Sequence, residues 1–170
     1  SEKRKIKTFL NQQFKIGGTN HADTAYFSST IQSIIHYKGR RVFLVGGVCE
    51  DKPFDNFGIG FCGVEGKEGT WKDAEDGILS NNPIEHGIID SVISWEREIP
   101  GNSYITIYYW IAVGETHRQV CELLDCILNK TGEHLIESTG DFWRAWLNQV
   151  SIPFHHLSEY SKRLFYDSLL

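Results

Sequence analysis

The sequence predicts a mainly β protein, an antiparallel β-sandwich that is followed by C-terminal helices. Two changes in pattern indicate this. Up to about residue 114, apolar side chains recur with a period of two between short glycine- and proline-containing breaks, as in half-buried strands. After residue 114 the period becomes 3.6, which is typical of amphipathic helices. The chain also carries 10 Phe, 7 Tyr and 5 Trp, enough large side chains for one substantial core.

Residues 88–113 are expected to form a hairpin that serves as the spine of the sandwich. Alternate positions of 89–99 are apolar on one face (Ile89, Ile93, Trp95, Ile99) and polar on the other (Asp90, Ser94, Glu96, Glu98), so we expect one buried and one wet face. Pro100-Gly101-Asn102 is typical of a turn. Residues 103–113 are β-branched and aromatic, which predicts a central strand covered on both sides.

Three further extended segments precede this pair. Residues 3–16 alternate as a strand, and residues 31–45 predict a hairpin with Gly39 at its tip. Residues 57–64 carry Gly58, Gly60 and Gly63, which indicates a glycine-rich strand or loop that another backbone approaches closely. Residues 65–87 are polar and too many for a tight turn, and connections of this length are often functional.

The C-terminal part predicts three helices. Thr116 and Gln119 form a capping box, and Gly132 is the expected stop. A second helix contains Gly140, where we expect a kink or break, and Ser151-Ile152-Pro153 separates it from a third helix at 158–170. We therefore divide the chain into a β domain, 1–114, and a helical linker, 115–170. Patterned segments are interrupted at Leu169-Leu170 and at the start, which predicts a truncated piece of a larger protein.

Composition excludes several classes of function. The formal net charge of −5 argues against a nucleic-acid-binding surface, and no apolar run approaches the length of a membrane span. The four cysteines match no zinc pattern, so we expect free thiols and a cytoplasmic location. The sequence indicates no cofactor.

The 69–87 stretch provides the candidate site residues. Three carboxylates, those of Asp73, Glu75 and Asp76, follow Trp71 and Lys72. We weigh a solvated or domain-docking loop first, proximity to substrate second and metal binding third, because the calcium-loop spacing is absent. Paired acid and base carboxylates normally converge from opposite sides of a substrate, which neighbours on one loop rarely do.

No complete catalytic constellation is visible. The seven histidines include an adjacent pair, His155-His156, but no metalloprotease spacing, and no serine has a nucleophile-elbow motif. Gly58-x-Gly60-x-x-Gly63 matches the dinucleotide fingerprint only as a bare string, since no helix follows it. The tyrosines at 104, 108 and 109 and Trp110 fit a core better than a sugar platform.

The stretch from Gly69 to Ser91 (GTWKDAEDGILSNNPIEHGIIDS) resembles the N-terminal domain of prokaryotic glucoamylase-like proteins of glycoside hydrolase family 15. Two other segments agree with that domain: FKIGGT at 14–19 with DTAY at 23–26, and YYWIAVGE at 108–115 with FWRAWL at 142–147. The resemblance extends from about Lys3 to Leu170.

The resemblance implies an antiparallel super-sandwich, similar to galactose-mutarotase-like domains, joined by a helical linker to an (α/α)6 barrel. In the family that barrel hydrolyses α-glucosidic bonds of maltooligosaccharides or other α-glucans with inversion, using two glutamates as general acid and general base. Neither glutamate motif occurs in this chain, so no catalytic residue is carried over. The expected partner is the protein's own barrel, docked on the 69–87 loop and the 142–147 helix.

Two other hypotheses about function stay open. The chain could be a stand-alone carbohydrate-binding or interaction sandwich in which Trp71 stacks on sugar, or a mutarotase-like enzyme with converging His and Glu residues. A truncated sandwich would also expose strand edges that the missing strands cover, which favours a homo-oligomer.

Overall fold

The computed structural model describes residues 2–19, 21–64, 66–148 and 156–168. The chain folds into two compact units, Ser1–Leu124 and Asp125–Leu170, which we describe separately. The interruption predicted at 151–153, His155, and the final two leucines lie outside the described residues.

The first unit contains a three-stranded antiparallel sheet. Its order is β1 (Arg4–Gln12), β8 (Ile89–Ile99) and β6 (Asn56–Phe61). The register pairs Thr8 with Trp95 and Gly58 with Val92. A strand therefore lies within each of the segments 3–16 and 57–64, although β1 ends at Gln12 and β6 at Phe61, and both strands flank the same central strand, β8.

The second sheet is larger. Its order is β5 (Lys52–Pro53), β4 (Arg41–Cys49), β3 (Ser33–Lys38), β2 (Asp23–Ser28) and β7 (Ile84–Gly87), and β9 (Ile107–Gly114) also pairs with β4. The predicted β3–β4 hairpin is confirmed: Lys38 pairs with Arg41, and Gly39 has a positive φ of 55°. Residues 84–87, expected to be part of a loop, instead form β7 on the edge of β2.

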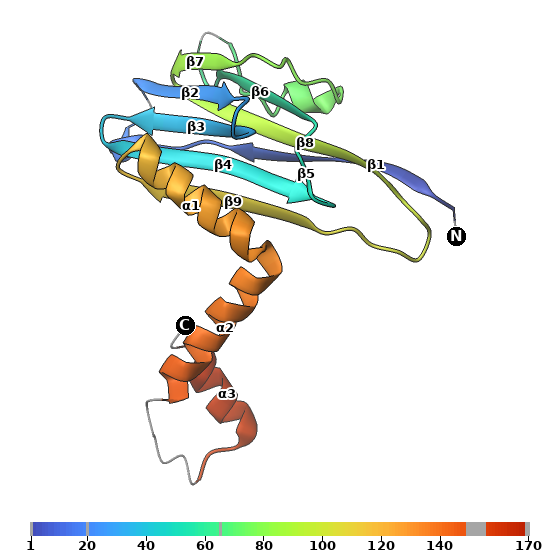
Figure 1. Cartoon of the computed structure of the whole chain (residues 1–170), viewed down its shortest axis with the longest axis vertical. Coiled ribbons are helices and arrows are strands. Elements are labelled where there is room, and N and C mark those ends of the chain that lie inside the picture. Colours follow the sequence, from blue (N-terminus) through green and yellow to red (C-terminus); the bar gives the residue numbers. More distant parts are fainter. Residues whose placement is uncertain (1, 20, 65, 149–155, 169–170) are drawn as a thin grey trace. The chain divides into compact units, whose positions relative to one another are not determined.

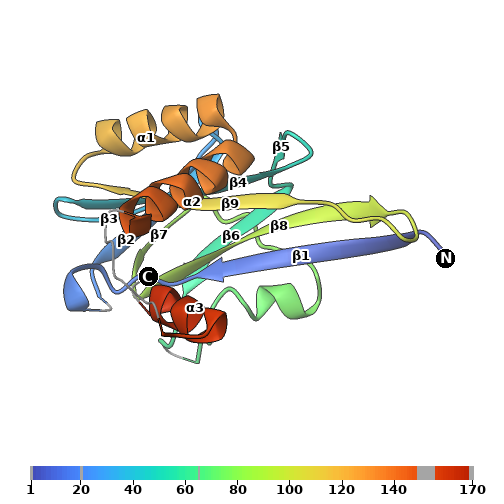
Figure 2. The same ribbon diagram turned by 90° about the horizontal axis from the view of Figure 1, so that it is seen from below.

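The two sheets form the predicted sandwich, because their facing sides share one core (Figures 1 and 2). Ile89, Ile93 and Trp95 of β8 are buried there with Ile34 and Val45 of the larger sheet. The core face predicted for 89–95 is thus confirmed.

The prediction that residues 88–113 form a central hairpin is wrong. β8 and β9 lie in different sheets, because both edges of β8 are taken by β1 and β6, and the intervening connection carries the chain across to β4. Among the described strands only β4 pairs with β9, so β9 is an edge strand and not a central one. The side chains of Ile111 and Val113 are 42% and 52% exposed.

The outer face of the larger sheet is covered by the first turns of α1 (His117–Lys130) (Figure 1). Val120 and Leu124 are buried, and each such side chain contributes about 1.5–3 kcal/mol to stability. The capping box is confirmed: the Gln119 N–H donates to Thr116 Oγ1 at 3.2 Å, and Gln119 Oε1 accepts from the Glu115 N–H at 2.8 Å.

The later helices differ from expectation in two details. α1 ends at Lys130, and Thr131, with φ of 61°, takes the left-handed position that we assigned to Gly132. Gly132 instead begins α2 (Gly132–Asn148), which continues through Gly140 without a break. α3 (Glu159–Asp167) starts at the Ser158 N-cap, whose hydroxyl accepts from the Ser161 N–H at 3.1 Å.

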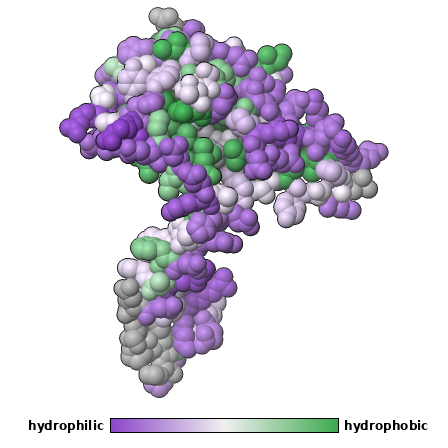
Figure 3. Space-filling view, in the orientation of Figure 1, coloured by the Kyte–Doolittle hydropathy of each residue, from purple (hydrophilic) through white to green (hydrophobic). Residues whose placement is uncertain are grey.

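The helical unit has an exposed apolar surface. Within the described part of the chain neither α2 nor α3 contains a buried residue. Figure 3 shows hydrophobic side chains at the surface of this unit beside hydrophilic ones. In α2 they include Ile136, Phe142, Trp143 and Trp146, which are 68%, 60%, 40% and 39% exposed.

Candidate functional site

The loop between β6 and β7 folds back over the face of β8 that was expected to be exposed to solvent. That expectation is wrong for Asp90 and Ser94, which are 1% and 0% exposed, and it holds for Glu96 and Glu98 further along the strand. The reason is the loop itself, whose Thr70 and Leu79 are buried.

Asp90 anchors the first half of this loop. Its carboxylate oxygens accept the Thr70 N–H at 3.0 and 2.9 Å. Asn11 of β1 donates to Asp90 Oδ2 at 3.1 Å and to Thr70 Oγ1 at 2.9 Å. Burial raises the pKa of Asp90, and the hydrogen bonds from Asn11 and Thr70 oppose that shift. The loop is therefore held by a buried, fully engaged carboxylate.

A second anchor holds the other half of the loop to β6. The Asn82 side-chain amide donates to the Ile59 carbonyl at 2.8 Å, and the Asn81 N–H donates to the Phe57 carbonyl at 3.0 Å. Gly60 permits a close approach, but by a side chain and not by the backbone that was expected: a Cβ there would lie 3.0 Å from Thr70 Cγ2. The first half of the loop is thus fixed to β8 and β1, and the second half is fixed to β6.

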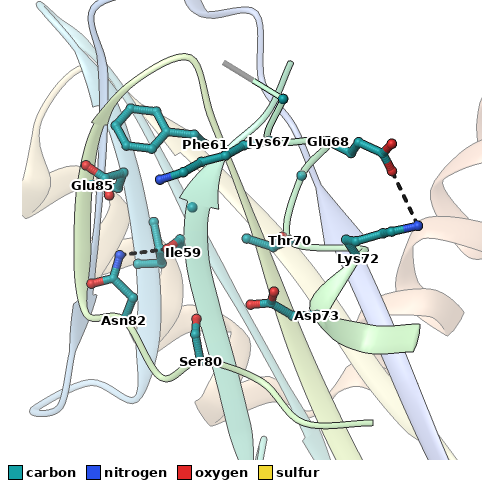
Figure 4. A pocket seen from close by; sticks show the side chains of 13 residues that line it. Ile59, Phe61, Lys67, Glu68, Thr70, Lys72, Asp73, Ser80, Asn82 and Glu85 are labelled. Carbon is teal, nitrogen blue, oxygen red and sulfur yellow. Dashed lines mark hydrogen bonds and ion pairs between the residues drawn. The ribbon is translucent and has the colours of Figure 1, made fainter. Parts of the chain in front are cut away.

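A pocket of about 510 Å³ lies between these walls, over β6 (Figure 4). Its volume falls within the range of small-molecule sites. Asp73 and Thr70 reach it from one side of β6, and Asn82 and Glu85 from the other (Figure 4). The complete lining is Ile59, Gly60, Phe61, Gly66, Lys67, Glu68, Gly69, Thr70, Lys72, Asp73, Ser80, Asn82 and Glu85.

Charges of both signs line this pocket. Lys72 Nζ lies 3.1 Å from Glu75 Oε2 and 3.5 Å from Glu68 Oε2, and these partners, Glu75 first, raise its pKa. Lys67 Nζ lies 4.8 Å from the centre of the Phe61 ring. The charge of Lys72 at the edge of the pocket is therefore already compensated by Glu68 and Glu75.

Two polar side chains in the pocket are uncommitted. The Asp73 carboxylate and the Ser80 hydroxyl form no hydrogen bond with any described residue. A ligand hydroxyl could donate to the first and either donate to or accept from the second. These are the groups most available for binding.

Of the five candidate residues of this loop, two line the pocket and three lie outside its lining. Lys72 and Asp73 line the pocket, and Asp73 opens a single 3-10 turn, Asp73–Glu75. Trp71, Glu75 and Asp76 lie outside the lining. The Trp71 ring is exposed and its Nε1–H donates to the Glu68 carbonyl at 3.1 Å. Asp76 Oδ1 accepts the Ile78 N–H at 2.8 Å.

Sequence reasoning missed Phe61, Asn82 and Glu85. The two glycines of β6 indicated a close backbone approach, but no sequence feature showed that β7 would border the same space. Glu85 comes from β7, opposite Ala25 of β2.

A second polar cluster lies inside the core and is closed to ligands. His36 Nε2 is 2.8 Å from Ser91 Oγ, and the Gln12 amide donates to the same hydroxyl at 2.7 Å. Ser91 is fully buried, and burial lowers the pKa of His36 to about 4. This cluster supports the packing of the sheets and provides no accessible nucleophile.

The described ranges lack three other features. They hold no group of three or more His, Cys, Asp or Glu side chains arranged to bind a metal ion. No disulfide joins cysteines in the part of the chain described. None of the described helices is long and apolar enough to cross a membrane.

Comparison with known proteins shows a similarity of fold. No protein-family model and no curated protein matches the chain. Among solved structures, the chain is similar to a bacterial glucoamylase in complex with acarbose, with a TM-score of 0.64 and 14% sequence identity. The match covers 84% of this chain and 20% of the glucoamylase, so the chain spans about one fifth of that protein. The chain therefore has a β-sandwich-plus-helices fold that a bacterial glucoamylase shares.

Proposed function

We propose that the chain is the non-catalytic N-terminal domain of a glucoamylase-like, inverting glycoside hydrolase of family 15. In this proposal it braces an (α/α)6 catalytic barrel that cleaves α-glucosidic bonds in maltooligosaccharides, dextrin or trehalose. The observation that carries the proposal is the similarity of fold to a bacterial glucoamylase over 84% of this chain.

The exposed aromatic face of α2 supports a bracing role. The ring centres of Trp143 and Trp146 are 5.8 Å apart, and those of Phe142 and Trp143 are 5.3 Å apart. Contiguous aromatic side chains at a surface mark interaction sites more often than chance exposure does. We assign this face to docking of the barrel.

The exposed edge of the 69–82 loop is a second, smaller docking candidate. Trp71 is 43% exposed although the loop around it is anchored on both sides of the pocket. A rigid loop that presents one large aromatic side chain costs little conformational entropy when a partner binds it.

The proposal assigns the catalytic acid and base to the barrel. Inversion requires two carboxyl groups about 6.5–9.5 Å apart on opposite sides of the scissile bond. Asp73, Glu75 and Asp76 belong to one short segment, which does not offer this arrangement. The 170-residue chain alone is expected to release no glucose.

The test is an activity assay on the longer protein whose gene encodes this chain. We expect glucose release from maltooligosaccharides, with the β-anomer formed first, and no release by the 170-residue chain alone. Trehalose is assayed in parallel to identify the preferred linkage. A gene without a barrel-encoding region, or release of the α-anomer first, would overturn the proposal.

A further inference from the structure

We propose that the pocket over β6 binds a sugar ring, and that Asp73, Ser80 and Asn82 make its principal polar contacts. The pocket is formed entirely by residues of this chain, so the proposal does not require a catalytic barrel. Only the choice of maltooligosaccharides as probes rests on the function proposed above.

The pocket is formed before a ligand arrives. The Asp90–Thr70 hydrogen bonds fix one wall, and the bond from Asn82 to the Ile59 carbonyl fixes the other. Preformed walls reduce the entropy lost on binding, which favours even a small ligand. The glycine at position 60 leaves the floor open between them.

The polar groups match hydroxyl groups better than ions. A sugar hydroxyl donates and accepts at once, and the pocket offers an acceptor in Asp73, a donor in Lys67, and both in Ser80. The Asn82 carbonyl oxygen adds another acceptor, because only its amide N–H is committed to Ile59. Neutral hydroxyls can satisfy this mixture without a change in net charge.

Charged ligands fit the pocket less well. Its lining carries Lys67 and Lys72 against Glu68, Asp73 and Glu85. A phosphate would lie against unpaired carboxylate, and Lys72 already has Glu68 and Glu75 as partners. A small cation would meet Lys67. A polyhydroxylated neutral ring avoids both penalties.

Phe61 supplies the apolar side that a sugar ring needs. It lies on β6 at the end of the pocket bordered by Lys67 and β7 (Figure 4). A partly exposed aromatic ring can pack against the C–H face of a pyranose. The more exposed Trp71 is not part of this lining, so the proposal differs from stacking on the Trp71 surface.

The proposal is tested by titrating the ¹⁵N-labelled 170-residue chain with maltose and maltotriose, following amide signals by NMR. We expect saturable shifts at Gly58, Gly60 and the Asn82 side-chain amide, with a dissociation constant on the order of 1 mM for so open a polar site. Shifts that never saturate, or that gather around Trp71 and spare β6, would overturn it.

Variants separate the pocket from its surroundings. Asp73→Ala removes a carboxylate that holds no described residue, so the chain should fold normally and bind maltose about tenfold more weakly. Ser80→Ala should weaken binding in the same direction. The matched control is Asp76→Asn, an acid beside the same turn and outside the lining, whose side-chain oxygen can still accept the Ile78 N–H; its affinity should stay within about twofold.

The outcome is independent of the proposed function. Unchanged affinity in Asp73→Ala, with folding verified by circular dichroism, would overturn the sugar site and leave the glucoamylase-like proposal intact. Conversely, a longer protein without glucosidase activity would overturn that proposal and leave a measured maltose affinity standing.

Discussion

The backbone N–H of Thr70 lies 3.0 and 2.9 Å from the two carboxylate oxygens of Asp90, a residue of β8 that is only 1% exposed. A single buried carboxylate on the central strand of the smaller sheet thus fixes the loop that forms one wall of the pocket. This carboxylate is costly to bury, and burial raises its pKa. The hydrogen bonds from Thr70 and Asn11 offset that cost.

Asp90→Ala should destabilise the first unit by about 1–3 kcal/mol, because the Thr70 N–H and the Asn11 amide lose their buried acceptor. Asp90→Asn keeps one acceptor oxygen and should cost less. The free energy of unfolding in urea measures both. Glu98→Ala, on the exposed part of the same strand, is the control and should change it by less than about 1 kcal/mol. Equal effects of Asp90→Ala and Glu98→Ala would contradict the anchoring role.

The burial of Asp90 could not be predicted from the sequence. Period-two alternation identified Ile89, Ile93 and Trp95 as core residues correctly, because that face packs on the other sheet. The same alternation predicted, wrongly, that the side chain of Asp90 is exposed to solvent. Local pattern cannot reveal that a loop from another part of the chain returns to cover the second face.

Strand pairing was predictable only where the turn was short. Gly39 set the β3–β4 hairpin correctly, because a tight turn fixes its own register. Pro100-Gly101-Asn102 suggested an equally close pair, yet the chain continues to Ile107 before β9 begins, far enough to change sheets. Of the candidate site, Lys72 and Asp73 were found through their unusual loop, and the residues from β6 and β7 were not.

The buried His36 should make stability depend on pH. Burial lowers its pKa to about 4 in the folded chain, against an ordinary value of 6.5. The unfolded state therefore binds more protons between these values, so stability is full above pH 6.5 and falls as the pH drops towards 4. The contribution amounts to about 3 kcal/mol over that window.

His36→Gln isolates this contribution. Glutamine can still bond Ser91 but does not titrate, so the difference in unfolding free energy between variant and wild type should shrink as the pH falls from 6.5 to 4. Urea denaturation at several pH values measures it. A difference that stays constant across this range would show that His36 is not the titrating group.

The aromatic face of α2 should matter only when the partner is present. Trp146 is 39% exposed, so Trp146→Ser should leave the stability of the 170-residue chain nearly unchanged. In the longer, barrel-containing protein that we propose, the same change should cost about 2 kcal/mol of stability, as for an aromatic residue at the centre of an interface. Thermal unfolding of both forms measures this, and maltooligosaccharide kinetics of the longer protein give a second readout.

Glu137→Gln, an exposed position on the same helix, is the control for Trp146→Ser. It should leave both forms unchanged. If Trp146→Ser weakens the short chain as much as the longer protein, the tryptophan stabilises α2 itself and not a docked barrel.

The free edge of β9 should make the 170-residue chain self-associate. β9 presents unpaired backbone groups along one side in the described structure, and its Ile111 and Val113 side chains are partly exposed. A free strand edge is a template for another strand. We expect a dimer fraction that rises with concentration in sedimentation velocity experiments.

Ile111→Lys should reduce this association, because a lysine directed inward from an edge strand must lose hydration when a second strand pairs there. Tyr104→Lys, which adds the same charge to the 85% exposed connection before β9, should leave it unchanged. Association equal in both variants would mean that another surface carries it, and the aromatic face of α2 would be the next to vary. A monomer at every concentration would mean that the short length and twist of β9 already protect its edge.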